Sequence, residues 1–179
     1  AYPGGDRLGE RLAEAQIRQR AQEVRPLRVL FLGSLTRRKG IRTLLKACEQ
    51  LERGKIELTI IGSQTAEPRY ARQIQAYIDR LKSNFPIKVL KAVPATALPE
   101  QLRAQDLLVV PSSYEGFGIV YLEGMAFGLP AIATTCGAAH ETIRHGQNGF
   151  LIGMGDSPTL ARHLRELAAN RGRLLSLSL

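Results

Sequence analysis

The chain has 179 residues, 44% of them hydrophobic, so it can build one core of ordinary domain size and has no room for a second full domain. Its 25 Lys and Arg against 16 Asp and Glu give a formal net charge of +9, which favours anionic partners or reflects a solvated basic surface. Nucleic acid is not expected as a partner, because the basic residues are spread along the chain and its Phe and Tyr residues do not interleave with them as stacking platforms.

The first 25 residues are expected to be a connector from another domain. After a Pro-Gly-Gly turn the segment continues as a charged helix with a thin apolar stripe, which is too polar to supply a core. We therefore predict a helical linker over residues 1–25 and a folded domain over residues 26–179.

From Pro26 onward, short apolar runs alternate with amphipathic helical segments. The predicted strands are Leu27–Gly33, Ile56–Gly62, Ile87–Leu90, Leu107–Pro111, Ala131–Thr134 and Phe150–Ile152. The predicted helices are Gly40–Arg53, Glu67–Asn84, Leu98–Ala104, Gly118–Phe127, Ala138–His145 and Thr159–Asn170, with the tail at 174–179 a frayed helix end or a truncation.

This alternation predicts an α/β fold with a doubly wound, mainly parallel six-stranded sheet of the Rossmann-like kind. The strands are apolar nearly throughout, as expected when helices cover both faces of a parallel sheet. Ligands of such sheets bind beyond the carboxyl ends of the strands, so the loops after strands are the place to look for chemistry.

The most informative of these loops lies in the segment 111–130, which runs from a strand end through a glycine-containing turn into a helix. Gly116 and Gly118 allow close backbone approach, and the free amides at the helix start favour a phosphate. Glu115 and Glu123 would lie about 12 Å apart on a helix, roughly the span of a nucleotide sugar, whereas the carboxylates of a retaining hydrolase lie about 5 Å apart. They are either two hydroxyl-binding carboxylates beside an anion site or two solvated charges.

This segment resembles the signature of glycosyltransferase family 4, retaining enzymes with two facing Rossmann-like domains, in which two glutamates flank a Phe-Gly turn. The resemblance extends from about Pro26 to Asn170 and includes the Lys-Gly turn after the first strand, the Ala-Gln-Asp before the fourth, and the Gly-Leu-Pro before the fifth. It implies that the chain is the carboxy-terminal, donor-binding half of a group 1 enzyme of the GT-B type, a retaining hexosyltransferase whose acceptor is held by an amino-terminal domain.

The resemblance also implies residue roles. Glu115 matches the glutamate that contacts donor-sugar hydroxyls near the reacting carbon, and Glu123 matches the one that holds the ribose. In the family, the backbone of one turn contacts the sugar and the diphosphate. In this chain that turn corresponds to Gly116, Phe117, Gly118 and Ile119. Val93 falls in the loop where the family binds the nucleobase through main-chain atoms, although ordinary loop packing would also explain it.

Lys39 matches the diphosphate-binding lysine of the family and, with Glu115, is the expected catalytic residue. The family usually carries an arginine directly after the strand-end glycine, here Gly33, but this chain has Ser34. Arg37 or Arg38 would then have to reach the phosphates in place of that arginine. The alternative is that these basic residues form only a solvated surface turn. Neither a G-x-x-x-x-G-K-[ST] nor a G-x-G-x-x-G motif is present at this turn.

No cofactor and no obligatory metal are expected, so the leaving diphosphate would be stabilised by cations and helix-end amides. Cys48 and Cys136 are far apart in the sequence, which fits a reduced, cytoplasmic compartment. No apolar run approaches the roughly 20 residues needed to cross a bilayer, so contact with the inner face of a membrane would be peripheral.

The expected partners are a nucleotide-sugar donor and a sugar, glycan or lipid-linked acceptor. The residues do not identify the donor sugar, the base or the acceptor. Two alternatives stay open: a nucleotide-binding module without activity of its own, and a sugar-nucleotide epimerase or phosphorylase of the same architecture.

Overall fold

A computed structural model describes residues 11–179 of the chain, so the predicted connector over residues 1–25 lies partly outside the described residues. Within the described part, a single six-stranded sheet has the strand order β3-β2-β1-β4-β5-β6, and every strand pairing in it is parallel. The strands are β1 (Leu27–Leu32), β2 (Ile56–Ile61), β3 (Ile87–Leu90), β4 (Leu107–Val110), β5 (Ala131–Thr134) and β6 (Gly149–Ile152). The predicted α/β fold with a parallel six-stranded sheet is confirmed.

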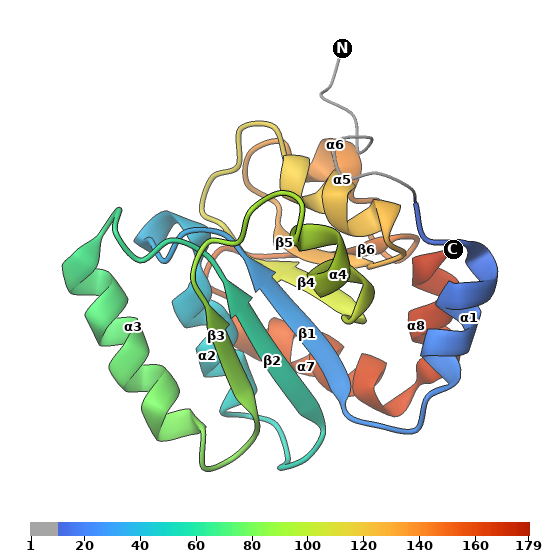
Figure 1. The fold of residues 1–179 in the computed structure, drawn as a ribbon, viewed down its shortest axis with the longest axis horizontal. Helices are drawn as coiled ribbons and strands as arrows, with labels where there is room; N and C mark the ends of the chain where they lie inside the picture. Colours follow the sequence, from blue (N-terminus) through green and yellow to red (C-terminus); the bar gives the residue numbers. More distant parts are fainter. Residues whose placement is uncertain (1–10) are drawn as a thin grey trace.

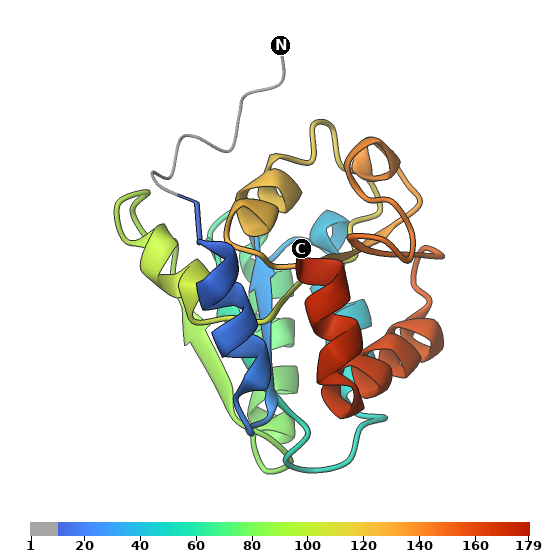
Figure 2. The ribbon, with the colours of Figure 1, turned by 90° about the vertical axis from the view of Figure 1, so that its right-hand side faces the viewer.

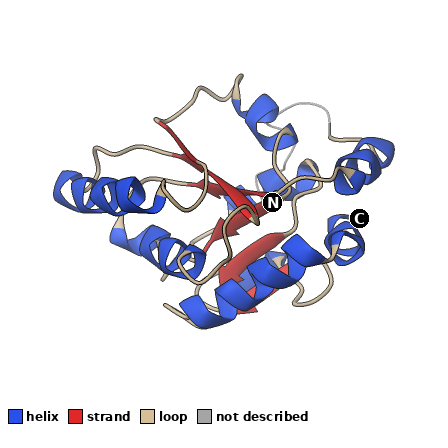
Figure 3. Cartoon of the chain, turned by 90° about the horizontal axis from the view of Figure 1, so that it is seen from below, coloured by secondary structure: helices blue, strands red, loops and turns tan. Residues whose placement is uncertain are grey.

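The central strands are buried on both faces, which explains their continuous apolar sequences. Every residue of β4 is fully buried, and β1 pairs with β2 along its whole length, from Leu27 opposite Ile56 to Leu32 opposite Ile61. Helices cover both faces of the sheet, with α2 and α7 behind it and α4 and α5 in front of it in the view of Figure 1. Figure 3, seen from below, shows the same layers of helix, sheet and helix.

The helices follow the predicted order with shifted ends. They are α1 (Glu14–Gln22), α2 (Ile41–Cys48), α3 (Pro68–Leu81), α4 (Leu98–Arg103), α5 (Ile119–Ala126), α6 (Ala139–Thr142), α7 (Ser157–Ala169) and α8 (Arg171–Ser178), with the short 3₁₀ helix η2 at Arg37–Lys39. α2 ends at Cys48, five residues before the predicted end at Arg53. The next amides bond to carbonyls three residues back, Gln50 N to Ala47 O and Leu51 N to Cys48 O, and these bonds tighten the last turn. α6 ends at Thr142, before the predicted His145. The Arg144 amide donates a hydrogen bond to the side chain of Asn148 and so belongs to the next turn, not to the helix.

The beginning and the end of the described chain form a pair of helices. α1 and α8 lie side by side, as Figure 2 shows, and Ile17 of α1 and Leu174 and Leu177 of α8 are buried. The tail predicted as a frayed end or a truncation is therefore an ordered helix that packs. Between α1 and β1, residues 23–26 carry Arg25, whose guanidinium donates to the buried carboxylate of Asp106 in a bidentate pair at 2.5 and 3.0 Å.

Among residues 11–179, no helix is both long enough and apolar enough to cross a membrane.

Candidate functional site

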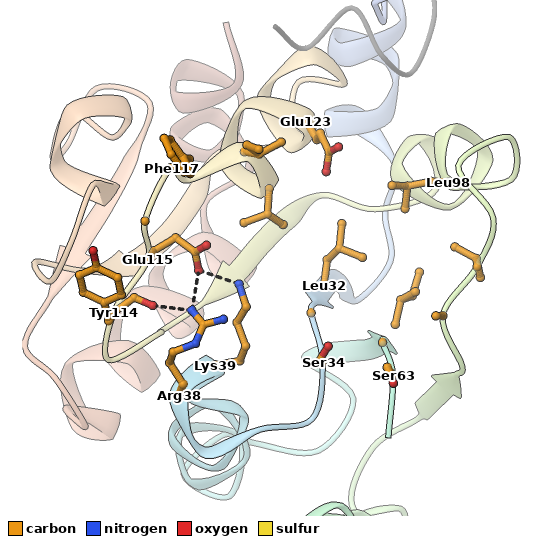
Figure 4. Close-up of a pocket in the computed structure, with 18 residues that line it drawn as sticks. Leu32, Ser34, Arg38, Lys39, Ser63, Leu98, Tyr114, Glu115, Phe117 and Glu123 are labelled. Atoms are coloured by element: carbon orange, nitrogen blue, oxygen red, sulfur yellow. Dashed lines mark hydrogen bonds and ion pairs between the residues drawn. The ribbon is translucent and has the colours of Figure 1, made fainter. Parts of the chain in front are cut away.

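A cleft of about 670 Å³ opens at the carboxyl edge of the sheet, where β1 and β4 lie side by side and the strand order reverses (Figure 4). At such a switch point the chain winds outward in both directions, and ligands of doubly wound sheets bind there, beyond the carboxyl ends of the strands. Its volume lies within the range of small-molecule sites.

Most of the predicted site residues line this cleft. They are Gly33, Ser34, Arg38, Lys39, Val93, Glu115, Gly116, Phe117, Ile119 and Glu123. Gly118 does not line it, because this residue is buried as the left-handed N-cap of α5 (φ 62°). Arg37 does not line it either, because its guanidinium lies 5.0 Å from the centre of the Tyr70 ring on the other side of the turn. The binding roles of all these residues remain predictions.

At the centre of the site, Glu115 Oε2 joins the loop after β4 to the turn after β1. It accepts a hydrogen bond from Lys39 Nζ at 2.6 Å and another from Ser112 Oγ at 3.2 Å. Both charged side chains are largely buried, with 13% of Lys39 and 14% of Glu115 exposed, so their interaction is poorly screened by solvent. Within the described chain Glu115 Oε1 makes no hydrogen bond, which leaves this oxygen available on the cleft side.

Arg38 adds a second cation to the same wall. Its Nη1 donates to the carbonyl of Tyr114 at 2.8 Å and lies 3.9 Å from Glu115 Oε2. About half of its side chain is exposed, so its guanidinium can move more freely than the Lys39 ammonium. Of the two arginines proposed to replace the one missing at Ser34, the structure thus brings Arg38 and not Arg37 to the cleft.

The basic turn lies against the end of β4 because Gly40 lets the two backbones touch. Gly40 has φ 72°, and a Cβ on it would stand 2.0 Å from the carbonyl oxygen of Pro111. Ser113 N also donates to Arg38 O at 2.8 Å. Any side chain at position 40 would therefore push Lys39 away from Glu115.

The loop that carries Glu115 is fixed from the other side by the turn after β5. Ala138 N donates to Glu115 O at 2.8 Å, and a Cβ on Gly137 would stand 2.3 Å from the same oxygen. Beneath the loop, the fully buried Tyr121 of α5 donates its hydroxyl to Val110 O at 2.9 Å. Burial, and to a lesser degree the charge of Glu115, raises the pKa of Tyr121, so its hydroxyl stays a donor.

Helix α5 directs its first turn and Glu123 toward the cleft. It begins at Ile119 directly after Gly118, so its first amides lie at the cleft edge, with the positive end of the helix dipole. Figure 4 shows Glu123 on the wall of the cleft apart from the pair of Glu115 and Lys39. The two carboxylates thus lie at different parts of one cleft, as the spacing predicts.

The sequence prediction missed part of the cleft wall. The additional lining residues are Leu32, Ile61, Gly62, Ser63, Ala92, Leu98, Tyr114 and Val120. Gly62 and Ser63 directly follow β2, so a search of every strand end would have found them. Leu98 belongs to α4 and reaches the cleft only through tertiary packing, for which the sequence carries no signal.

Comparisons with known proteins identify relatives of this chain. A sequence model of the family described as "Glycosyl transferases group 1" matches residues 13–177. An uncharacterised glycosyltransferase of Methanocaldococcus jannaschii is 36% identical over 125 residues, which are 69% of this chain and 31% of that protein. A D-inositol 3-phosphate glycosyltransferase of Pseudarthrobacter chlorophenolicus is 32% identical over 128 residues, 69% of this chain and 30% of that protein.

Among solved structures, the crystal structure of HepE from Anabaena in complex with UDP-glucose superposes with a TM-score of 0.83 at 26% identity. The match covers 99% of this chain and 49% of HepE. The chain thus spans about a third of the length of the curated relatives and about half of this structural neighbour.

Proposed function

Because the chain belongs to the glycosyl transferases group 1 family, we propose that it is the donor-binding half of a retaining, family 4 glycosyltransferase and holds a nucleotide-diphosphate sugar. The resemblance between this fold and a protein crystallised with UDP-glucose supports a nucleotide-sugar donor. The observation that carries the proposal is the meeting of Lys39 and Glu115 at the cleft where β1 and β4 end.

In this proposal Lys39 and Arg38 face the diphosphate, and the first amides of α5 add partial positive charge from the same side of the cleft. Negative charge grows on the diphosphate as the bond to the sugar breaks. Cations already held in place stabilise that charge without reorganisation. Lys39 suits this role because its side chain is largely buried and held by Glu115.

Glu115 has a second task in the proposal. While its Oε2 holds Lys39, its Oε1 can accept hydrogen bonds from hydroxyl groups of the donor sugar. Glu123, on another part of the cleft wall, accepts hydrogen bonds from the ribose hydroxyls. Val93 and its neighbours then lie where the base binds, with contacts through main-chain atoms.

The acceptor site belongs to the part of the enzyme that the relatives carry outside the matched region, since the chain spans only about a third of their length. The acceptor is proposed as a sugar, glycan or lipid-linked molecule, and the enzyme as a cytoplasmic protein that can contact the inner face of a membrane peripherally. Without a second domain to exclude water and position the acceptor, the chain alone is expected to bind nucleotide and transfer no sugar.

Calorimetric titration of the chain with uridine, guanosine and adenosine diphosphates tests the donor site. We expect weak binding of one of them, and we expect Lys39→Gln to weaken it about 10- to 100-fold, the effect of losing a charged hydrogen bond. Arg37→Gln is the matched control, because this neighbouring cation lies outside the cleft.

No binding of any of the three nucleotides at millimolar concentration would contradict the proposed donor site. An equal effect of Lys39→Gln and Arg37→Gln would show that only the general charge of the turn matters. Sugar transfer by the chain alone would contradict the proposed division between two domains.

A further inference from the structure

Part of the excess positive charge of the chain lies away from the donor cleft. Residues 37–82 carry 11 Lys and Arg against 5 Asp and Glu, although they form only a quarter of the sequence. Of these cations, only Arg38 and Lys39 line the cleft. The remaining excess lies on α2, α3 and the loops that flank them, and the donor site does not account for it.

A groove of about 380 Å³ runs between α2 and α3. Arg42 and Lys46, one helical turn apart, project from α2, and Arg80 projects from α3. Its other lining residues, all on α3, are Gln73, Tyr70, Ile74 and Tyr77. The three cations and Gln73 are exposed, whereas Tyr70 and Ile74 are buried, so the groove has a charged rim and a recessed floor.

The charges of the rim are not neutralised within the protein. Among residues 11–179, no carboxylate lies within 4.0 Å of the cationic atoms of Arg42, Lys46 or Arg80. Other cations in the same region are paired, since Lys82 lies 2.8 Å from Asp79 and Lys55 lies 3.7 Å from Glu52.

The carboxylate of Glu49, which directly follows α2, lies close to the groove residue Tyr77. Burial raises the pKa of Tyr77, and the nearby Glu49 carboxylate raises it further. Arg80 lies with its guanidinium carbon 5.0 Å from the centre of the Tyr77 ring, which holds this cation at the rim. Three cations therefore surround one hollow, and none of them forms an ion pair with a carboxylate among the described residues.

We propose that this groove is a second anion site, which binds a phosphate group of a small soluble molecule. Two guanidinium groups, an ammonium group and the Gln73 amide offer many N–H donors around one hollow, and tetrahedral phosphate oxygens match that arrangement. A bilayer surface fits less well, because the large exposed hydrophobic residues of the described chain all lie outside α2 and α3. They are Val24, Tyr114, Phe117, Met154 and Leu179.

The groove and the donor cleft share no lining residue, so the two sites can be tested separately. The probe is inorganic pyrophosphate, followed by amide chemical shifts in the ¹⁵N-labelled chain. We expect saturable shifts of the amides of α2 and of residues 73–80, in addition to any shifts at the donor cleft. Lys39→Gln should leave the groove shifts unchanged.

Lys46→Gln and Arg80→Gln should each weaken pyrophosphate binding at the groove about threefold to tenfold, and the pair should abolish it. Arg144→Gln, which removes an exposed cation from a loop outside both sites, should have no effect. The positions are exposed, so the variants should fold, and thermal unfolding checks this.

Three results would overturn the proposal. The first is the absence of saturable shifts on α2 and α3. The second is equal weakening by Arg144→Gln, which would show only a diffuse charge effect. The third is co-sedimentation with phosphatidylcholine vesicles that contain phosphatidic acid, lost in the Lys46→Gln and Arg80→Gln variants and not reversed by pyrophosphate. That outcome would assign the groove to a membrane surface.

Discussion

Glu115 is the residue on which the two halves of the site depend. Its Oε2 accepts from Lys39 and from Ser112, so the ammonium that is proposed to meet the diphosphate is already bound to a carboxylate. A nucleoside diphosphate without its sugar has to compete with Glu115 for Lys39, and it offers Glu115 no sugar hydroxyl in return.

From this competition we predict opposite effects of the two glutamates on nucleoside diphosphate affinity. Glu115→Gln should leave the affinity unchanged or raise it a few-fold, because Lys39 loses a competing anion. Glu123→Gln should lower it about 10-fold, as expected for weaker hydrogen bonds to the ribose. Calorimetry on the two variants measures both effects. A loss of affinity in Glu115→Gln as large as in Glu123→Gln would contradict the assigned roles.

At the scale of single residues, the sequence predicted most of the residues that line the cleft and missed the contacts that position them. Lys39 and Glu115 follow from the motif and its resemblance. The hydrogen bond from Ser112 is local to the loop after β4, three residues before Glu115, and no sequence motif predicts it. The lining by Ser63 depends on which strand ends lie side by side, and that depends on the sheet order. The separation of Arg37 from Arg38 depends on the 3₁₀ turn and on a nearby tyrosine ring.

Among the elements, α5 is the helix on which the site depends, and a residue from the predicted connector holds its far end. Arg20 of α1 donates to the carbonyls of Phe127 and Gly128 at 3.0 and 2.7 Å, and Leu12 N donates to Ala126 O at 3.0 Å. A cation at the carboxyl end of a helix satisfies carbonyls that have no partner within the helix and complements its dipole.

We therefore predict that Arg20→Met destabilises the fold by about 2–4 kcal/mol, because it leaves two buried carbonyls without donors. Urea unfolding followed by circular dichroism measures the change. Arg18→Met is the control, since this residue of the same helix pairs with Glu14 at the surface and should cost at most about 0.5 kcal/mol. Similar losses in both variants would show that helix propensity and not the carbonyl contacts is responsible.

Strands were predictable as elements because burial on both faces leaves a continuous apolar run, as in the Leu-Leu-Val-Val of β4. Helix ends were predicted less well. The ends of α2 and α6 are set by local hydrogen bonds, which compete with the helix over one turn and leave no periodic signal. Helix α8 was missed because its apolar residues pack against α1, which the sequence alone describes as a polar connector.

For the molecule as a whole, the carboxylate of Asp106 at the start of β4 is the point where several segments meet. Its side chain is 1% exposed and bonds to the guanidinium of Arg25 at 2.5 Å, to that of Arg171 at 3.3 Å and to the amide of Arg28 at 2.9 Å. Burial lowers the pKa of Arg25, but hydrogen bonds to Asp106 and Glu23 outweigh it and raise the pKa above its ordinary value.

Removal of this charge should affect the whole fold. We predict that Asp106→Asn lowers the free energy of unfolding by about 3–5 kcal/mol, because it leaves buried guanidinium groups without their carboxylate. Equilibrium unfolding in urea tests this, with Asp79→Asn as the control at an exposed pair, where the loss should be at most about 1 kcal/mol. A small change in Asp106→Asn would show that water replaces the carboxylate at little cost.

The antiparallel pairing of α1 and α8 also determines how the domain would resist a mechanical force. In Figure 2 both ends of the described chain lie at the same end of this helix pair, and Leu12 and Leu179 line one hollow there. A pull that separates them would peel the helices apart from that end, one turn at a time, and would not shear the strands of the sheet. Peeling would stop at Arg25 and Arg171, where Asp106 holds both segments at the opposite end.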